Sequence, residues 1–389
     1  MKSSYKMLGQ YIRPIDVRNT DGQETNLLGV SVQKKFIPSI ANTVGTDFTK
    51  YKVVKKRQFT YIPDTSRRGD KIGIALLEDY DSGIVSNIYT VFEVIDTEQL
   101  LPEYLMLWFM RPEFDRLARF KSHGSVREVF DWEQMCSVEL PVPDIEKQRK
   151  IVNAYKTIND RIIMKQQIND NLEATAQAIF QEQFASFYSN DDLPAGYNIV
   201  NLDSLCTVKG GKRLPADCEL LDTPTAHPYI RVRDVGNSRY ICLTNQFQYI
   251  DEDTHSAISR YIVDTNDIVI SIVGTIGLLG KVHYSLDKAN LTENCVKLTE
   301  VHTITPDYLY YTLCYKKQTN EIELLTVGAV QAKLPMYNIQ SMKILVPPTE
   351  IIDKFQADME VFNTQIEANT IEIQRLYDLQ NLLLAKLSD

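Results

Sequence analysis

Mostly hydrophobic residues recur at alternating spacings of four and three positions in two long segments of the chain. The ten positions of the first segment are Ile151, Tyr155, Ile158, Ile162, Lys165, Asn169, Leu172, Ala176, Ile179 and Gln183, and those of the second are Phe355, Met359, Phe362, Ile366, Asn369, Ile373, Leu376, Gln380, Leu383 and Leu387. A period of 3.5 residues is typical of a coiled-coil helix, whose apolar stripe must be buried against a partner. We therefore expect two long helices that pack against each other in antiparallel orientation.

The second segment repeats the first at a distance of 204 residues, and other motifs follow the same offset. The sequence PEYL at 102–105 corresponds to PDYL at 306–309, and a Val-Pro pair follows in each copy. A duplicated chain predicts two similar domains, each followed by one long helix. The expected boundaries are 1–145 for the first domain, 146–187 for the first helix, 188–348 for the second domain and 349–389 for the second helix.

The part of each copy before the long helix has the pattern of a mixed domain. Residues 51–61 and 261–271 align at an offset of 210 and are rich in residues that favour strands. The first copy therefore holds six extra residues, which we place in the turn-forming segment 63–70. Helices are expected from Pro102 to about Phe120 and from Pro306 to about Leu324. The predicted fold class is α+β, with two mixed α/β domains separated by an antiparallel coiled coil and related by a pseudo-twofold repeat.

Each helix carries one asparagine in the predicted seam near its middle. Antiparallel pairing places Asn169, the sixth position of the first helix, opposite Asn369, the fifth position of the second. A buried amide pair lowers the stability of a coiled coil but can set its register. The alternative is that the two asparagines are polar gaps in a seam that frays.

Composition indicates a folded protein and excludes several classes of function. The 389 residues are 44% hydrophobic and 24% charged, which suits two or three domains. The net charge of −9 argues against a simple nucleic-acid binder, although the first half holds dense basic clusters around residues 50–57 and 67–71. No apolar stretch could span a membrane, and the N-terminal sequence lacks the apolar core of a secretion signal. We therefore expect a cytoplasmic protein without membrane contact.

Motifs for catalysis, cofactors or metals are not found in the sequence. An adenine methyltransferase would need an Asn/Asp-Pro-Pro-aromatic motif and a glycine-rich loop for its methyl donor, and the chain has neither. The glycines at 209–213 and 274–277 are expected to form structural turns. The six cysteines include no CxxC pair, and the five histidines are scattered. We therefore expect no catalytic residue, no metal site and no cofactor.

Several motifs, taken together with the repeat, resemble one family over essentially the whole chain. They are LPVPDIEKQRKIV at 140–152, PYIRVRDV at 228–235, NDIVISIVGTIGLLGKV at 266–282, PDYLYYTL at 306–313 and GAVQAKLPMYNIQSMKILVPP at 328–348. This set is similar to the specificity (S) subunit of type I restriction–modification systems. The chain departs from the family pattern at Asp144, where a second proline is usual, and after Pro348, where the Glu-Gln pair of the helix entrance is missing.

The resemblance implies a non-catalytic subunit that recognises DNA. Its two target-recognition domains would read a bipartite double-stranded site, and it would assemble with two modification subunits that carry adenine-N6 methyltransferase activity. Restriction subunits with translocase and endonuclease activity would join this core. A first helix of about 50 Å, at 1.5 Å per residue, would separate the half-sites by on the order of 10–15 base pairs.

Candidate DNA contacts are polar and basic residues in the loops, where side chains can reach phosphates and base edges. In the first domain they are Ser66, Arg67, Arg68 and Lys71, and the loop residues Lys121, Ser125 and Arg127. In the second domain they are Lys209, Lys212 and Arg213, then Arg231 and Arg233, and the loop residues Gln331 and Lys333. The main alternative function is a coiled-coil adaptor whose globular domains bind protein rather than DNA.

Overall fold

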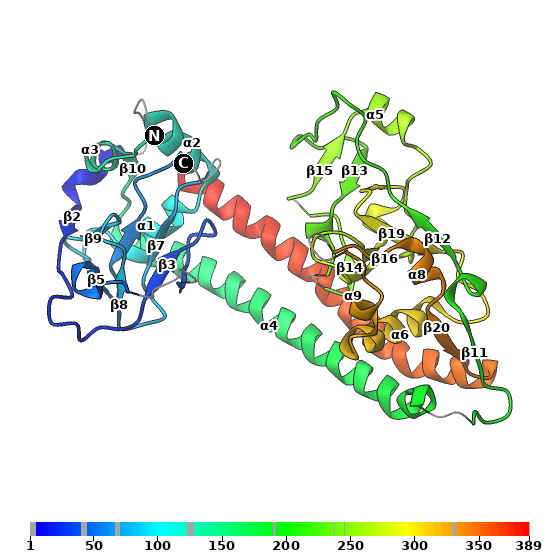
Figure 1. Ribbon diagram of the computed structural model, residues 1–389. Helices are drawn as coiled ribbons and strands as arrows, with labels where there is room; N and C mark the ends of the chain where they lie inside the picture. The colour runs from blue at the N-terminus through cyan, green and yellow to red at the C-terminus, as the bar shows by residue number, and fades with distance from the viewer. Residues whose placement is uncertain are drawn as a thin grey trace. The chain divides into compact units, whose positions relative to one another are not determined.

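The computed structural model describes residues 5–39, 45–66, 71–122, 128–189, 192–236, 238–244, 246–328 and 332–388. Its contacts divide the chain into two compact units, Met1–Arg161 with Leu376–Asp389, and Ile162–Arg375. Each unit holds one globular domain and a section of both long helices (Figure 1). We refer to these globular parts as the first domain and the second domain.

The two long helices are α4 (Ile145–Phe184) and α9 (Thr349–Ala385), which have 40 and 37 residues. The carboxylate of Asp144 accepts a hydrogen bond from the backbone amide of Lys147 at 2.9 Å. This contact satisfies one of the amides that the first turn of a helix leaves without an intrahelical partner. The residue that departs from the family's proline pair therefore serves as a cap for α4.

Contacts within each unit show that the long helices are antiparallel. In the first unit, Leu384 and Leu387 from the C-terminal end of the chain share a hydrophobic core with Ile151 from the start of α4. In the second unit, the ring centroid of Phe184 at the end of α4 lies 5.4 Å from that of Phe355 near the start of α9. The predicted antiparallel pairing of the two helices is confirmed.

The predicted seam is buried through the middle of the helices and shifts at the end of α4. Ile162, Ala176 and Ile366 are buried, whereas Gln183 is exposed and its neighbour Phe184 is buried instead. A stripe with a period of 3.5 residues drifts around an α-helix by about 20° per heptad, because the helix turns once in 3.6 residues. At the end of α4 the buried face is set by the core of the second domain, to which Phe184 belongs.

The first domain is built on a four-stranded antiparallel sheet of order β2-β9-β6-β7, with three further strand pairs, β1-β10, β3-β4 and β5-β8. Its strands are β1 (Tyr5–Met7), β2 (Ile12–Ile15), β3 (Leu28–Val30), β4 (Phe36–Pro38), β5 (Lys52–Lys55), β6 (Phe59–Tyr61), β7 (Ile74–Leu76), β8 (Ser82–Val85), β9 (Thr90–Val94) and β10 (Glu139–Pro141). Its helices are α1 (Pro102–Phe109), α2 (Pro112–Lys121) and α3 (Trp132–Cys136), and its short 3-10 turns are Leu8–Gln10, Phe48–Lys50 and, after α9, Lys386–Ser388.

The second domain holds a five-stranded sheet of order β12-β19-β16-β17-β14, a three-stranded sheet of order β15-β13-β18 and the pair β11-β20. Its strands are β11 (Asn198–Asn201), β12 (Thr207–Gly210), β13 (His227–Ile230), β14 (Tyr240–Ile241), β15 (Gln248–Ile250), β16 (Ile268–Ser271), β17 (Leu279–Val282), β18 (Asn290–Leu291), β19 (Cys295–Thr299) and β20 (Lys343–Val346). Its helices are α5 (Glu252–Ala257), α6 (Pro306–Gln318), α7 (Glu321–Leu324) and α8 (Met336–Gln340), and its 3-10 turns are Ala185–Ser189, Leu202–Ser204, Val232–Asp234 and Tyr284–Leu286.

Equivalent hydrogen bonds in the two domains show the internal repeat directly. The hydroxyl of Tyr104 in α1 donates to the backbone carbonyl of Pro141 at 3.1 Å, and the hydroxyl of Tyr308 in α6 donates to that of Leu345 at 3.0 Å. Both donors and both acceptors differ by 204 positions. A buried tyrosine hydroxyl needs a partner, and each domain supplies the same carbonyl just before its long helix.

The structure corrects the helices predicted from Pro102 to about Phe120 and from Pro306 to about Leu324. Each is broken into two: α1 ends at Phe109 before Pro112 opens α2, and α6 ends at Gln318 before Asn320 adopts a left-handed backbone with a φ of +59°. Proline lacks the amide that would continue the helical ladder, and its ring crowds the preceding turn. The strand predicted at 51–61 is likewise two strands, β5 and β6, while 261–271 contains β16 alone and an isolated bridge at Ile262.

Candidate nucleic-acid interface

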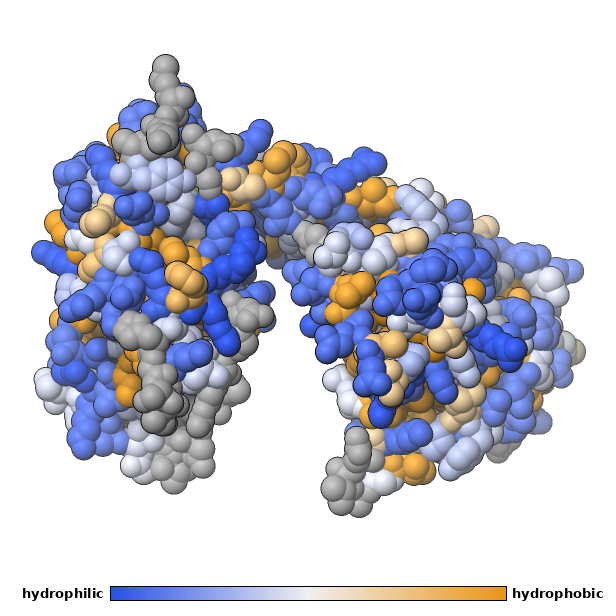
Figure 2. Space-filling model, turned by 90° about the horizontal axis from the view of Figure 1, so that it is seen from above, coloured by the Kyte–Doolittle hydropathy of each residue, from blue (hydrophilic) through white to orange (hydrophobic). Residues whose placement is uncertain are grey.

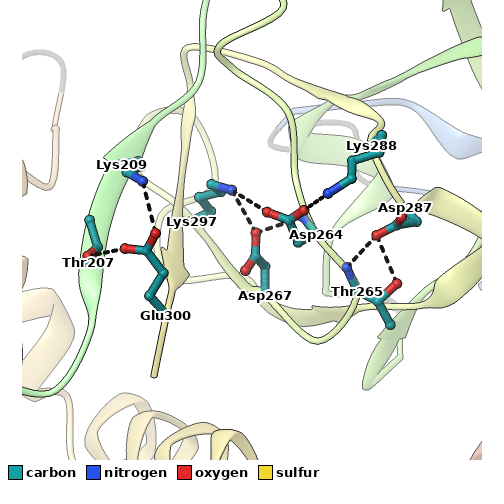
Figure 3. A network of polar contacts seen from close by, with 9 residues as sticks. All are labelled: Thr207, Lys209, Asp264, Thr265, Asp267, Asp287, Lys288, Lys297 and Glu300. Atoms are coloured by element: carbon teal, nitrogen blue, oxygen red, sulfur yellow. Dashed lines mark hydrogen bonds and ion pairs between the residues drawn. The ribbon is translucent and has the colours of Figure 1, made fainter. Parts of the chain in front are cut away.

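Lys209 lies in a network of alternating charges on the five-stranded sheet of the second domain. In the register of β12 and β19 it faces Lys297, an opposition of like charges that is unfavourable by itself. Carboxylates relieve it: the Nζ of Lys209 lies 3.7 Å from Glu300, and that of Lys297 lies 3.3 Å from Asp264 and 2.9 Å from Asp267 (Figure 3).

The same network continues through Lys288, which pairs with Asp264 (Figure 3). It ends at Asp287, whose carboxylate accepts hydrogen bonds from the backbone amide and the hydroxyl of Thr265. Three lysines therefore face four carboxylates in this network. A phosphate that approaches Lys209 must compete with Glu300, so this face attracts DNA only weakly by itself.

Lys212 and Arg213 follow β12 in a segment that is held tightly against the rest of the domain. A Cβ atom on Gly211 would lie 2.1 Å from the carbonyl oxygen of Thr292, so only glycine fits at this crossing. The ammonium of Lys212 lies 5.7 Å from the centroid of the Tyr261 ring, and the Nε of Arg213 is 2.8 Å from Glu293. The side chain of Arg213 is 81% exposed, so its outer face is accessible to a ligand.

Arg231 and Arg233 lie in one turn but in different surroundings. The guanidinium of Arg231 pairs with Asp234 at 2.8 Å and also contacts the side chain of Gln248, and only 13% of this side chain is exposed. The side chain of Arg233 is 65% exposed. The contacts of Arg231 hold the turn together, whereas Arg233 lies 4.0 Å from Asp234 and keeps most of its side chain at the surface.

The remaining candidates lie in loops, some of which are outside the described residues. Arg67, Arg68, Ser125, Arg127 and Gln331 fall on residues that the structure does not describe.

Four loop candidates are described. The hydroxyl of Ser66 donates to Asp64, and the Nζ of Lys121 donates to the hydroxyl of Ser137 at 2.7 Å. Lys71 and Lys333 are exposed, and the backbone of Lys333 pairs with Val327. Ser66 is also exposed, whereas Lys121 is partly buried.

The two asparagines of the seam are in contact. The side-chain amide of Asn369 donates to the side-chain carbonyl of Asn169 at 2.8 Å, and both residues are buried. The Nζ of Lys165 donates to the same Asn369 at 2.8 Å and lies 3.0 Å from Glu372. The pair is therefore satisfied inside the seam, and its role in setting the register stays a prediction.

The sequence analysis missed the buried charges of the second domain. Arg239, Lys281 and Asp307 are buried together with Glu173 of α4 nearby, and none of them was singled out. Lys281 stands in an apolar run between glycine and valine, and a lysine in such a run is the one signal that could have pointed to a buried ion pair.

The described residues show no group of three or more histidine, cysteine or acidic side chains able to hold a metal ion. All six cysteines are free, and burial raises the pKa of the thiols of Cys206, Cys242, Cys295 and Cys314 to about 12, so these thiols stay protonated. None of the described helices is both long enough and apolar enough to cross a membrane. On the face shown in Figure 2, hydrophobic side chains are scattered in small groups among hydrophilic ones.

The comparisons with known proteins agree with this architecture. The family model described as the type I restriction modification DNA specificity domain matches residues 10–174 and again residues 194–379. The chain therefore belongs to this family and carries its domain twice. Its function is that of a DNA sequence-recognition subunit of a type I restriction–modification system.

Individual relatives support the same assignment. The chain is similar to the type I restriction enzyme HindI specificity subunit of Haemophilus influenzae, with 23% identity over 86% of each chain. It is also 23% identical to the MjaIX specificity subunit of Methanocaldococcus jannaschii, over 76% of this chain and 70% of that one. The crystal structure of the type I system S subunit from M. genitalium has the same fold, with a TM-score of 0.51, 14% identity and coverage of 99% and 95% of the two chains.

Proposed function

We propose that the two domains read the two halves of one bipartite double-stranded DNA site. The observation that carries this proposal is the duplication: one chain holds two copies of a specificity domain, each followed by a long helix, and the helices pair in antiparallel fashion. An antiparallel pair of equivalent helices is what a pseudo-twofold axis requires, and such symmetry suits a target with two related halves. The length of the helices then sets the distance between the half-sites.

We propose that modification subunits, two in number, supply the adenine-N6 methyltransferase activity, and that restriction subunits supply translocation and cleavage. The doubled domain offers two equivalent surfaces for two copies of one partner. The partners also explain how a chain with a net charge of −9 works on DNA, because much of the positive surface can be theirs. The assembly would act in the cytoplasm, where the host DNA lies.

Among the predicted DNA contacts, the accessible ones are the strongest candidates. Lys71, Arg213, Arg233 and Lys333 are exposed in the described structure and suit phosphate or base contacts. Lys209 and Lys212 can contribute when their present partners, Glu300 and the Tyr261 ring, are displaced. Ser66, Lys121 and Arg231 have intramolecular partners and suit positioning of loops, while the contribution of Arg67, Arg68, Ser125, Arg127 and Gln331 stays a sequence-based proposal.

The test is methylome sequencing of a host strain with and without the gene for this chain. A bipartite motif with a fixed spacer that is methylated only when the chain is present is the expected result. If changes in one domain alter only one half of the methylated motif, that half is read by that domain. If no motif depends on the chain, or if its domains bind the partner subunits but not DNA, the chain is an adaptor and the proposal is wrong.

A further inference from the structure

Asp307 of the second domain lies at the centre of a buried polar junction. It is the second residue of α6 and is 7% exposed. One carboxylate oxygen accepts hydrogen bonds from Arg239 and Lys281, which belong to the sheet region around β14 and β17. The other oxygen accepts from two side chains of the long helix α9, Gln356 at 2.9 Å and Asn363 at 2.8 Å. One carboxylate therefore ties the sheet, α6 and a long helix together.

The other long helix contributes to the same junction. The carboxylate of Glu173 in α4 lies 3.8 Å from the guanidinium of Arg239, whose side chain is fully buried. Four residues further along α4, the amide of Gln177 donates to the backbone carbonyl of Tyr311 at 3.4 Å. The second domain is thus joined to both long helices through directional contacts and not only through apolar packing.

The repeat shows that this junction is specific to the second copy. The position equivalent to Asp307 is Glu103, which is paired at 3.3 Å with Arg57, a side chain that is half exposed. The position equivalent to Gln356 is Val152, which packs against the hydrophobic core of the first domain. In the first unit the long helix α4 adds to this apolar core the buried Gln148, whose neutral side chain donates to the backbone carbonyl of Gln99 and accepts from the backbone amide of Leu101, both at 2.9 Å. A buried carboxylate shared between sheet, α6 and long helix is therefore what distinguishes the second unit.

A junction around a buried charge resists motion more strongly than apolar packing does. Apolar packing has little directionality, so a domain held by it can rock with a small loss of contact. Hydrogen bonds to a buried carboxylate weaken steeply when their geometry changes, and an unpaired charge would be left behind in the interior. A junction of this kind holds one orientation between the elements that it joins.

We propose that Asp307, through Gln356 and Asn363, is a positioning element that holds the second domain in one orientation on the long helices and thereby makes the complex selective for one spacer length. The inference rests on the proposed function, because it concerns how far apart two DNA half-sites are read. It assigns no DNA contact to these residues, since Asp307 and Asn363 are buried and Gln356 is partly buried.

The experiment removes the long-helix side of the junction and leaves the ion pairs of Asp307 in place. Replacing Asp307 itself would remove the nearest counter-charge of the buried Arg239 and Lys281, and the variant could fail to fold. The double variant Gln356→Ala/Asn363→Ala is therefore used, with the two single variants as graded steps. Asn159→Ala, at the position of the first copy equivalent to Asn363, and Thr364→Ala, on the exposed face of α9, are the controls.

Each variant is assembled with its methyltransferase subunits, and its affinity is measured for duplexes that carry the methylated motif with the native spacer or with one base pair more or less. The wild-type complex and both controls should prefer the native spacer strongly. In the double variant, the ratio of the affinities for the native and the altered spacers should fall roughly tenfold, mainly because the altered spacers bind better. The single variants should lie in between. Thermal unfolding of the free chain confirms that each variant is folded.

Two results would overturn the inference. One is a double variant with the wild-type spacer preference, and the other is an equal loss of affinity for all spacers, which is what a merely structural role produces. Failure of the proposed function looks different, because the wild-type complex itself would then show no dependence on the spacer.

Discussion

At the scale of single residues, most basic side chains of the second domain already have acidic partners. Lys209 lies near Glu300, Arg213 is paired with Glu293, and Lys288 is paired with Asp264. Exposed pairs of this kind add little to stability, since solvent and salt screen them. They do lower the local positive potential, and a DNA phosphate has to displace the carboxylate in order to bind.

Removal of one such carboxylate should therefore strengthen DNA binding. We expect Glu293→Gln to raise the affinity of the assembled complex for its site by roughly three- to tenfold and to make binding more sensitive to salt, because Arg213 becomes free for a phosphate. Binding is measured by fluorescence anisotropy over a range of salt concentrations. Glu360→Gln, an equal charge change on the exposed face of α9, is the control. An identical response of the two variants would show that Arg213 has no role at the interface.

Glu173 is an acid whose protonation should couple to stability. Burial raises its pKa to about 7, although Arg239 partly offsets this effect. An acid with a raised pKa binds its proton more tightly in the folded state than in the unfolded state. The stability that this proton contributes is complete below about pH 4.5 and is lost as the pH rises to about 7.

The variant Glu173→Gln, which stays neutral, should therefore be more stable than the wild type at pH 8, by on the order of 2 kcal/mol, and similar to it at pH 5. Urea unfolding at the two pH values measures the difference. Equal stability gains at both pH values would mean that the effect is not due to the ionisation of this carboxyl group.

At the scale of elements, the asparagine pair links the sequence pattern to the pairing of the helices. Asn169 and Asn369 are in contact at the position that antiparallel pairing of the ten seam residues implies. Apolar neighbours in the seam would pack equally well after a shift of one heptad, whereas an amide pair is satisfied only in one register. We therefore expect the polar pair to lower the stability of the coiled coil and to define the alignment of α4 and α9.

Replacing both asparagines with leucine should raise the thermal unfolding temperature by a few degrees and allow more than one register. Disulfide trapping measures the register: cysteine pairs placed for the native alignment and for an alignment shifted by seven residues should both form in the double variant, and only the first in the wild type. A sharp fall in stability, or exclusive native trapping, would contradict the role assigned to the pair.

The breaks in the predicted helices show the limit of sequence patterns at this scale. The predicted helix continued through Met110 and Arg111, but Pro112 cannot supply the amide that the ladder needs, and the chain starts a second helix there. In the second copy no proline is present at this point, and Asn320 ends the helix with a left-handed backbone. Both breaks were within reach of the sequence, since proline and asparagine favour such positions, whereas the strands of two to five residues were not.

At the scale of the whole molecule, the paired helices act as a spacer in the proposed function. Deleting 158–164 from α4 together with 374–380 from α9 removes two heptads that face each other on the same side of the asparagine contact. Neither heptad contributes to the hydrophobic core of a domain. Seven residues correspond to a rise of about 10 Å, or roughly three base pairs of DNA. We expect methylation of the native motif to be lost, and any remaining activity to fall on a motif with a spacer shorter by about three base pairs.

Methylome sequencing of a host that expresses the shortened chain measures this outcome. The control is the single deletion of 158–164, which shortens only one of the two paired helices. It should abolish methylation, because the asparagine contact and the contacts near the first domain can then no longer form in one register. Continued methylation of the original motif by the chain with both deletions would show that the long helices do not set the half-site distance.

The duplication, the two long helices, their antiparallel pairing and the family were all determined by the sequence alone, because apolar periodicity and a constant offset are properties of the chain itself. The positions of the breaks in the short helices and the pairing of the surface lysines were decided only by the tertiary structure. So was the junction around Asp307, whose partners come from residues 239, 281, 356 and 363. Which buried charges meet depends on how distant elements pack, and no local pattern of hydrophobic and polar positions carries that information.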